Sequence, residues 1–308
     1  MRLLYGCASG TDIRLPANTK TSLRILNLAA GPARSIMKRL LRASVNFLPH
    51  GLRTWIKYLP GIAALQRGLV SRLISGEPFL HTVNAGPAKG LRFEVTLPLD
   101  KAIWAGTYES EFAEAIARGL KPGNVCYDIG GYRGYMAGVM ALAGASKVFV
   151  FEPLPMNQKA LRRLCELNPK LPIELLPVAI GKADGLTMLK VMADPSMGKL
   201  ASSSFQPESA FQDELEIGIR SIDTQVEEGK IPPPDLVKVD VEGAELDVLR
   251  GATRVLTVSR PSLFLEAHSA SLERSCSQML QNLGYKVHRL GSEPSRDEHA
   301  RHLVCLPT

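Results

Sequence analysis

Residues 124–134 carry the sequence NVCYDIGGYRG, a short β-rich run followed at once by a glycine turn. The apolar residues of 124–129 predict a buried strand, and the turn at 130–134 predicts its abrupt end. Residues 135–145 are rich in Ala, Met and Leu and therefore predict a helix. A strand, a glycine turn and a helix in this order are common at the start of an open α/β sheet.

The same alternation continues along the chain. Strands that alternate with helices predict a parallel sheet with crossover helices, doubly wound because such crossovers are right-handed. Two extra strands, 186–192 and 215–222, flank a polar segment, 193–214, that has no periodicity of its own. The other strands are predicted at 147–152, 173–180, 235–241 and 262–268, with helices at 155–167, 244–256 and 271–283.

The last two predicted strands, 285–290 and 302–306, are separated by the short segment 291–300, which has no helical pattern. A parallel crossover needs a dozen or more residues, so this pair is expected to form an antiparallel hairpin. The predicted fold class is α/β and Rossmann-like: a mostly parallel seven-stranded sheet that ends in a C-terminal antiparallel hairpin.

Charge divides the chain into two parts. The 308 residues have a net charge of +7, but residues 1–76 hold 12 Lys/Arg against one acid, Asp12, which leaves 25 bases and 29 acids in residues 77–308. We therefore predict a basic leader over 1–78, partly disordered and partly helical, and a second domain over 79–308. No stretch is long and apolar enough to predict a membrane-spanning helix.

Residues 36–48 of the leader predict a basic amphipathic helix. Three interpretations remain open: peripheral contact with an anionic membrane surface, packing of the helix on the main domain, or an organellar targeting sequence. The five cysteines include no CxxC pair, which excludes a cysteine-only zinc site and favours a reducing, cytoplasmic location.

The glycine turn discriminates between two nucleotide cofactors. A dinucleotide fingerprint would require glycine at position 129, where this chain has Ile129. The spacing instead suits S-adenosylmethionine, which has no diphosphate, and an NAD-dependent oxidoreductase remains the alternative. The residues predicted to bind the cofactor are those of the turn, with Glu152 after the second strand as the ribose-binding acid: Asp128, Gly130, Gly131, Gly134 and Glu152.

Five motifs together resemble the FkbM family of S-adenosylmethionine-dependent methyltransferases: DIGGYRG (128–134), FEPLPMN (151–157), LPVAIG (176–181), LVKVDVEGAELDVLRGA (236–252) and LFLEAH (263–268). The resemblance covers residues 108–307 and implies a class I methyltransferase fold and O-methylation of sugars, polyketides or other hydroxylated small molecules. It matches Asp128, Gly130 and Gly134 to the cofactor turn and Glu152 to the ribose acid. Gly131 and Tyr132 replace the Ala and Asn common in the family.

Acidic and imidazole side chains follow two strands that are expected to be neighbours. Asp240 and Glu242 lie at and just past the end of the strand 235–241, and Glu266 and His268 lie at the end of the strand 262–268. Ligands of open α/β sheets bind beyond the carboxyl ends of the strands, so these groups are expected to meet beside the reacting methyl. We predict His268 as the general base, with Asp240 or Glu266 assisting it.

Alternatives to this catalytic reading remain. The carboxylates and His268 could form a structural network in which buried Lys238 pairs with one acid, while Glu242 and Glu245 favour the start of the next helix. No metal site is predicted, because Asp240 and Glu242 alone are a weak signal. Tyr108 and Glu109 are expected either to line the cofactor cleft or to begin a helix.

The sequence thus predicts a methyltransferase that uses S-adenosylmethionine and acts on oxygen of a small molecule or glycan, with 193–214 contacting the acceptor. The basic leader raises the alternative of a nucleic-acid methyltransferase. That alternative is disfavoured because residues 240–243 read DVEG, and not the Asn/Asp-Pro-Pro-aromatic motif of base methylation. A non-catalytic cofactor-binding module is also left open, as is the oligomeric state.

Overall fold

The computed structural model describes residues 76–192, 198–200, 211–291 and 301–308. The chain divides into two compact units, Met1–Glu77 and Pro78–Thr308, and only the second is described below. The helix predicted at 36–48 and most of the predicted acceptor segment 193–214 lie outside the described residues. Within the described ranges, no helix has the length and apolar character needed to cross a membrane.

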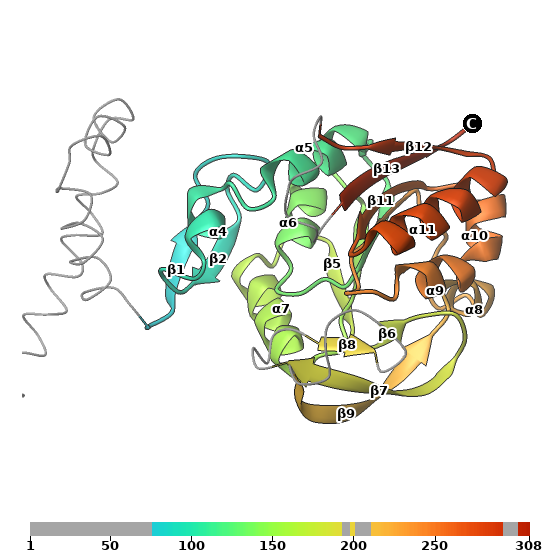
Figure 1. The fold of residues 1–308 in the computed structure, drawn as a ribbon. Helices are drawn as coiled ribbons and strands as arrows, with labels where there is room; N and C mark the ends of the chain where they lie inside the picture. Colours follow the sequence, from blue (N-terminus) through green and yellow to red (C-terminus); the bar gives the residue numbers. More distant parts are fainter. Residues whose placement is uncertain (1–75, 193–197, 201–210, 292–300) are drawn as a thin grey trace, which may run out of the picture. The chain divides into compact units, whose positions relative to one another are not determined.

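A seven-stranded sheet forms the centre of this unit, in the order β12-β13-β11-β10-β3-β4-β5 (Figure 1). The five strands from β11 to β5 are parallel to one another, whereas β13 is antiparallel to both of its neighbours. The predicted sheet and its terminal hairpin are therefore confirmed. The strands are β3 (Val125–Ile129), β4 (Lys147–Phe151), β5 (Ile173–Leu176), β10 (Leu236–Val239), β11 (Ser262–Ala267), β12 (Tyr285–Arg289) and β13 (Arg301–Pro307).

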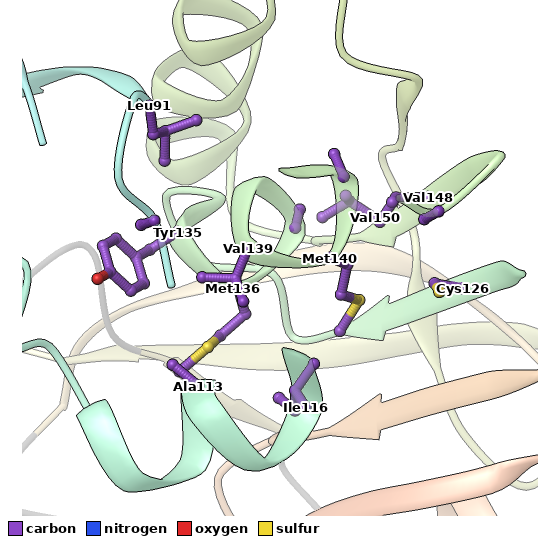
Figure 2. Close-up of a cluster of buried hydrophobic side chains, with 14 of the residues drawn as sticks. Leu91, Ala113, Ile116, Cys126, Tyr135, Met136, Val139, Met140, Val148 and Val150 are labelled. Carbon is purple, nitrogen blue, oxygen red and sulfur yellow. The ribbon is translucent and has the colours of Figure 1, made fainter. Parts of the chain in front are cut away.

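Helices cover both faces of this sheet (Figure 1). Successive residues of a strand point to opposite faces, so Cys126 of β3 joins one core and Tyr127 joins the other. Figure 2 shows the first core, where side chains of α5 and α6 meet beside Cys126, Val148 and Val150. The first core includes α5 (Ser110–Gly119), α6 (Tyr135–Leu142) and α7 (Pro155–Leu167); the second includes α8 (Ile222–Glu227), α9 (Glu245–Arg250), α10 (Thr253–Val258) and α11 (Ala270–Asn282).

Two predicted elements are each split in the structure. The strand expected at 173–180 ends as β5 before Pro177, which has no N–H to donate, and resumes as β6 (Ala179–Ile180) in a second sheet. The helix expected at 244–256 breaks into α9 and α10 because Asp223 supplies a tertiary cap. Its carboxylate accepts from the backbone N–H groups of Arg254 and Val255, and its own N–H donates to the Gly251 carbonyl.

The second sheet has the order β6-β9-β7-β8. It contains β7 (Gly185–Met192), β8 (Gly198–Leu200) and β9 (Phe211–Arg220), which confirms the two extra predicted strands. The second of these ends earlier than expected because Ser221 caps α8, with its side chain accepting from Thr224 N at 3.1 Å. Before the large sheet lie β1 (Phe79–Thr82), β2 (Arg92–Val95) and α4 (Lys101–Ala105), for which the sequence made no prediction.

Candidate functional site

A cavity of about 670 Å³ lies beyond the carboxyl ends of β3, β4 and β10. This volume falls within the range of about 300 to 1,000 Å³ typical of small-molecule sites. The rest of the wall includes Asp100 and Ile103, from the α4 region, and Leu189, from β7 of the second sheet. The position beyond the strand ends is where open α/β sheets bind their ligands.

The glycine turn after β3 is held tightly against its neighbours. Gly130 has φ 78°, and a Cβ there would lie 1.7 Å from the Asp240 carbonyl oxygen. Gly134 has φ 86°, and its Cβ would meet Leu161 and Leu164. Backbone geometry and packing within the protein therefore require glycine at both positions, whatever ligand the turn faces.

Glu152 follows β4 and is a buried carboxylate on the cavity wall. Its Oε2 accepts from Tyr132 N at 2.8 Å, and its Oε1 accepts from Leu154 N at 2.9 Å. Burial raises the pKa of Glu152 to about 7, although these hydrogen bonds oppose the shift. The Asn157 side chain also hydrogen-bonds this carboxylate, so three groups of the protein hold it in place.

A buried lysine connects the turn to the end of β10. Lys238 Nζ lies 3.1 Å from Asp128 Oδ1 and 3.3 Å from Asp240 Oδ2, and it donates to the Gly130 carbonyl at 2.8 Å. The predicted pairing of Lys238 with an acid is confirmed. Burial by itself lowers the pKa of Lys238, but the negative charges beside it, led by Asp128, outweigh burial and raise that pKa above its usual range.

His268 lies behind the carboxylates, and it is not one of the residues that line the cavity. Its Nδ1 is 2.6 Å from Glu245 Oε1, while its Nε2 faces Asp240 Oδ1 at 3.6 Å, Glu242 Oε2 at 3.5 Å and Glu266 Oε1 at 3.7 Å. Burial alone would lower the pKa of His268, but the Glu245 hydrogen bond and the neighbouring carboxylates raise it to about 9. The role of His268 as general base stays a prediction.

Glu266 is shared between two histidines. Its Oε1 faces His268, and its Oε2 lies 3.1 Å from Nε2 of His302, whose ring stacks on Phe112 at 4.1 Å. Glu109 lies on the cavity wall near Glu266. Burial raises the pKa of Glu109 to about 7, with further contributions from the negative charges of Glu266 and Asp240.

Backbone strain is concentrated at this cavity. Among the described residues, four that are not glycine have φ between 41° and 51°. Three of them, Glu109, Tyr132 and Glu242, line the cavity. Such conformations cost about 1 to 3 kcal/mol each and cluster at functional sites in proteins generally.

The structure places the predicted site residues at two depths. The cavity is lined by four predicted residues: Gly130, Glu152, Asp240 and Glu266. It is also lined by Tyr108 and Glu109, as one of the two alternatives for that pair expected. Asp128, Gly131, Gly134 and His268 do not line it. The Asp128 side chain is fully buried against Lys238, and its contact with the cofactor stays a prediction.

Other wall residues were missed. Arg133 lines the cavity and is fixed by Asp100 Oδ1 at 2.5 Å and by the Glu94 carbonyl at 2.7 Å. Thr96, Asp100 and Leu99 come from a segment without strong periodicity, so no sequence signal marked them. Asn157 also lines the cavity; its presence in the motif 151–157 was the one available signal.

Two groups of side chains bring potential metal ligands together. One comprises Asp240, Glu266 and His268, and the other comprises Glu109, Glu266 and His302. In each group one ligand atom per residue lies within 4.8 Å of the others. Carboxylate and imidazole groups are common ligands of divalent cations.

Comparison with known proteins gives consistent matches. Residues 128–292 match the methyltransferase FkbM domain family. Over 157 residues the chain is 29% identical to the hexuronic acid methyltransferase AglP of Haloferax volcanii. The aligned region covers 51% of this chain and 61% of that protein. The chain therefore spans less than two thirds of the length of this curated relative.

Solved structures match at lower identity. The methyltransferase FkbM of Methylobacillus flagellatus KT has a TM-score of 0.43 at 19% identity, with 63% of this chain and 50% of that chain covered. The precorrin-6y C5,15-methyltransferase of Geobacter metallireducens GS-15 has a TM-score of 0.41 at 13% identity, with 64% and 87% covered.

The sheet order, the hairpin and the cavity beyond β3 and β4 define a class I methyltransferase fold. The family match takes in more than half of the 308 residues and includes the glycine turn, Glu152 and the DVEG segment. The chain belongs to the methyltransferase FkbM domain family. The resemblance drawn from the sequence motifs is thereby confirmed.

Proposed function

We propose that this protein transfers a methyl group from S-adenosylmethionine to a hydroxyl oxygen of a sugar, with hexuronic acids as the acceptor class. The observation that carries the proposal is a single cavity lined both by Gly130 and Glu152 and by Asp240 and Glu266. Family membership supports the reaction class, and the similarity to a hexuronic acid methyltransferase supports the acceptor class. These matches favour neither an NAD-dependent oxidoreductase nor a nucleic-acid methyltransferase.

The residues present fit the cofactor. Glu152 stands at the end of the second parallel strand and lines the cavity, with both oxygens held by backbone N–H groups. It is suited to accept hydrogen bonds from the two ribose hydroxyls. Gly130 brings the backbone of the turn to the same wall, where its lack of a side chain lets the turn pack against the Asp240 carbonyl. When bound, S-adenosylmethionine supplies an electrophilic methyl carbon on a positively charged sulfur.

The chain's own residues then hold the acceptor. Asp240, Glu266 and Glu109 line the cavity and orient the acceptor hydroxyl, which must approach the methyl carbon to about 3 to 3.5 Å in line with the breaking bond. The hydroxyl proton passes to one of these carboxylates as the new carbon–oxygen bond forms. His268 acts through Asp240 and Glu266 as a positioning residue, because its ring lies behind them.

Methyl-labelled S-adenosylmethionine offered with glucuronic acid, galacturonic acid and their neutral parent sugars tests the proposal. We expect label on a ring hydroxyl of a hexuronic acid, located by mass spectrometry. Asp240→Asn and Glu266→Gln are expected to lower kcat by about 10² to 10⁴ while S-adenosylhomocysteine still binds. Glu166→Gln, on the exposed face of α7, is the control with unchanged activity.

Calorimetry separates the cofactor from its rival. We expect S-adenosylhomocysteine to bind and NAD not to bind. We expect Glu152→Gln to weaken the binding of S-adenosylhomocysteine. An absence of binding of S-adenosylhomocysteine, or transfer of label to none of the sugars, would refute the proposal.

A further inference from the structure

We infer that Asp240, Glu266 and His268 form a divalent-cation site at the edge of the cavity where the acceptor binds. The role of this ion in methyl transfer rests on the proposed function, whereas its binding does not. The sequence predicted no metal site, because Asp240 and Glu242, the one close carboxylate pair along the chain, are a weak signal by themselves.

The near atoms of the three side chains converge. His268 Nε2 lies 3.6 Å from Asp240 Oδ1 and 3.7 Å from Glu266 Oε1. These separations are too long for hydrogen bonds. They approach the spacing of atoms that share an ion, since metal–ligand bonds of about 2.1 to 2.4 Å place adjacent ligand atoms about 3.0 to 3.4 Å apart. A contraction of a few tenths of an ångström and release of the proton from His268 Nε2 to solvent would complete the site.

The far atom of every ligand is held by another side chain. Asp240 Oδ2 is 3.3 Å from Lys238 Nζ, and Glu266 Oε2 is 3.1 Å from His302 Nε2. His268 Nδ1 is 2.6 Å from Glu245 Oε1, and Glu245 is fully buried outside the ligand group. A carboxylate on the far nitrogen is the usual support of a metal-binding histidine, because it fixes the ring and raises its basicity.

The alternative group, Glu109, Glu266 and His302, is less suitable. Its imidazole and one carboxylate are already joined to each other, since His302 Nε2 lies within hydrogen-bond distance of Glu266 Oε2. The His302 ring is also held flat against Phe112. An ion there would have to break the first contact, so the geometry favours the group around His268.

The charge of the wall is independent support. Six carboxylates line the cavity: Asp100, Glu109, Glu152, Asp240, Glu242 and Glu266. Among the described residues, Arg133 is the only Lys or Arg on the wall, and it is engaged by Asp100. A hexuronic acid would add another negative charge to this edge. A divalent cation would offset the repulsion and could bind the carboxylate and a hydroxyl oxygen of the acceptor together.

Mn²⁺ is the probe of choice, because the ligand set mixes carboxylates with one imidazole. The EDTA-treated full chain is titrated with Mn²⁺, without cofactor or acceptor, by calorimetry and electron paramagnetic resonance. We expect saturable binding of about one ion per chain and a nitrogen coupling in the spin-echo spectrum. Asp240→Asn, Glu266→Gln and His268→Ala are expected to weaken binding by about 10- to 100-fold or more, and His268→Ala to remove the coupling.

Two controls locate the ion. His302→Gln removes a ligand only from the alternative group and is expected to leave the nitrogen coupling unchanged, whereas exposed Glu166→Gln changes a carboxylate far from the site. Thermal melting checks that every variant is folded. Three results would overturn the inference: no saturable binding below about 1 mM, unchanged binding in folded Asp240→Asn and His268→Ala, or loss of the coupling in His302→Gln alone.

The same proteins distinguish this inference from the proposed function. Bound Mn²⁺ without methyl transfer would leave the ion site standing and contradict the methyltransferase. Undiminished methyl transfer in EDTA, by a chain that binds no Mn²⁺, would support the methyltransferase and contradict the ion site.

Discussion

Lys238 lies directly opposite Asp128 in the parallel register of β10 and β3, and its ammonium is 3.1 Å from the Asp128 carboxylate. The same ammonium holds the carbonyl of Gly130 and approaches Asp240. One buried cation therefore links the turn after β3, where the cofactor is proposed to bind, to the end of β10, where the acceptor is proposed to bind.

Lys238→Met tests this link. The substitution leaves buried Asp128 without its cation, and breaking a buried pair in this way costs about 3 to 5 kcal/mol. We expect the free energy of unfolding, measured in urea, to fall by that amount. Adding Asp128→Leu should recover part of the loss, because no buried charge is then left behind at that position.

Arg250→Met provides the matched surface control. Arg250 pairs with Asp247 at 3.1 Å, but both side chains are exposed, so the change is expected to stay below about 1 kcal/mol. Equal losses for Lys238→Met and Arg250→Met would contradict a structural role for the buried pair.

Gly130→Ala is expected to disrupt the turn. The added Cβ would lie 1.7 Å from the Asp240 carbonyl oxygen at a φ of 78°, and backbone atoms cannot yield as a side chain can. Left-handed strain costs about 1 to 2 kcal/mol, and overpacking adds about 1 to 3 kcal/mol. Urea unfolding should show a loss of at least about 2 kcal/mol, with weakened binding of S-adenosylhomocysteine.

Gly185→Ala is the control for that substitution, because a Cβ at the start of β7 meets nothing within 4 Å. It is expected to leave stability and ligand binding nearly unchanged. A Gly130→Ala protein as stable as Gly185→Ala would show that the close approach to Asp240 is not a constraint.

Binding of S-adenosylhomocysteine is expected to depend on pH through Glu152. Burial raises the Glu152 pKa from an ordinary 4.5 to about 7, so in the free protein the carboxyl is protonated below pH 7 and ionised above it. Only the ionised group accepts hydrogen bonds from both ribose hydroxyls. If the ionised form alone binds, affinity should rise about 10-fold from pH 6 to pH 8 by calorimetry.

Glu152→Gln removes the titrating group and keeps the shape. It should bind more weakly at pH 8 and lose the pH-dependent increase seen in the unmodified chain. An unaltered pH profile in this variant would assign the dependence to another group.

Glu245→Gln tests the support of His268 without touching the cavity. Glu245 Oε1 accepts from the Gly243 backbone N–H and contacts His268 Nδ1, so the amide would weaken the orientation of the ring. Mn²⁺ affinity is expected to fall about 10- to 100-fold. Asp247→Asn, two residues further along α9 and partly exposed, should bind Mn²⁺ normally; comparable losses in both variants would point to a general effect of α9.

Local pattern was sufficient for the elements of the large sheet. β3 and α7 lie where periodicity and the glycine turn predicted them, because a strand with glycine after it and a helix with apolar residues at three and four spacing are defined by neighbours in sequence. Pro177 is a local signal for the break within 173–180, but the pairing of β6 with β9 in a second sheet was not predictable. The break within 244–256 was not predictable either, because it follows from a cap supplied by Asp223, which lies far along the chain.

The sequence alone determined the fold class and the family. It also determined the edge of the sheet where Glu152, Asp240 and Glu266 gather, because motifs and strand ends are local properties. Tertiary structure alone decided which of those groups reaches the cavity. Asp128 and His268 lie at the same edge, yet both are buried behind other side chains. Strand register and the packing of Lys238 and Glu245 set their depth, and these depend on contacts across the sheet that no local pattern encodes.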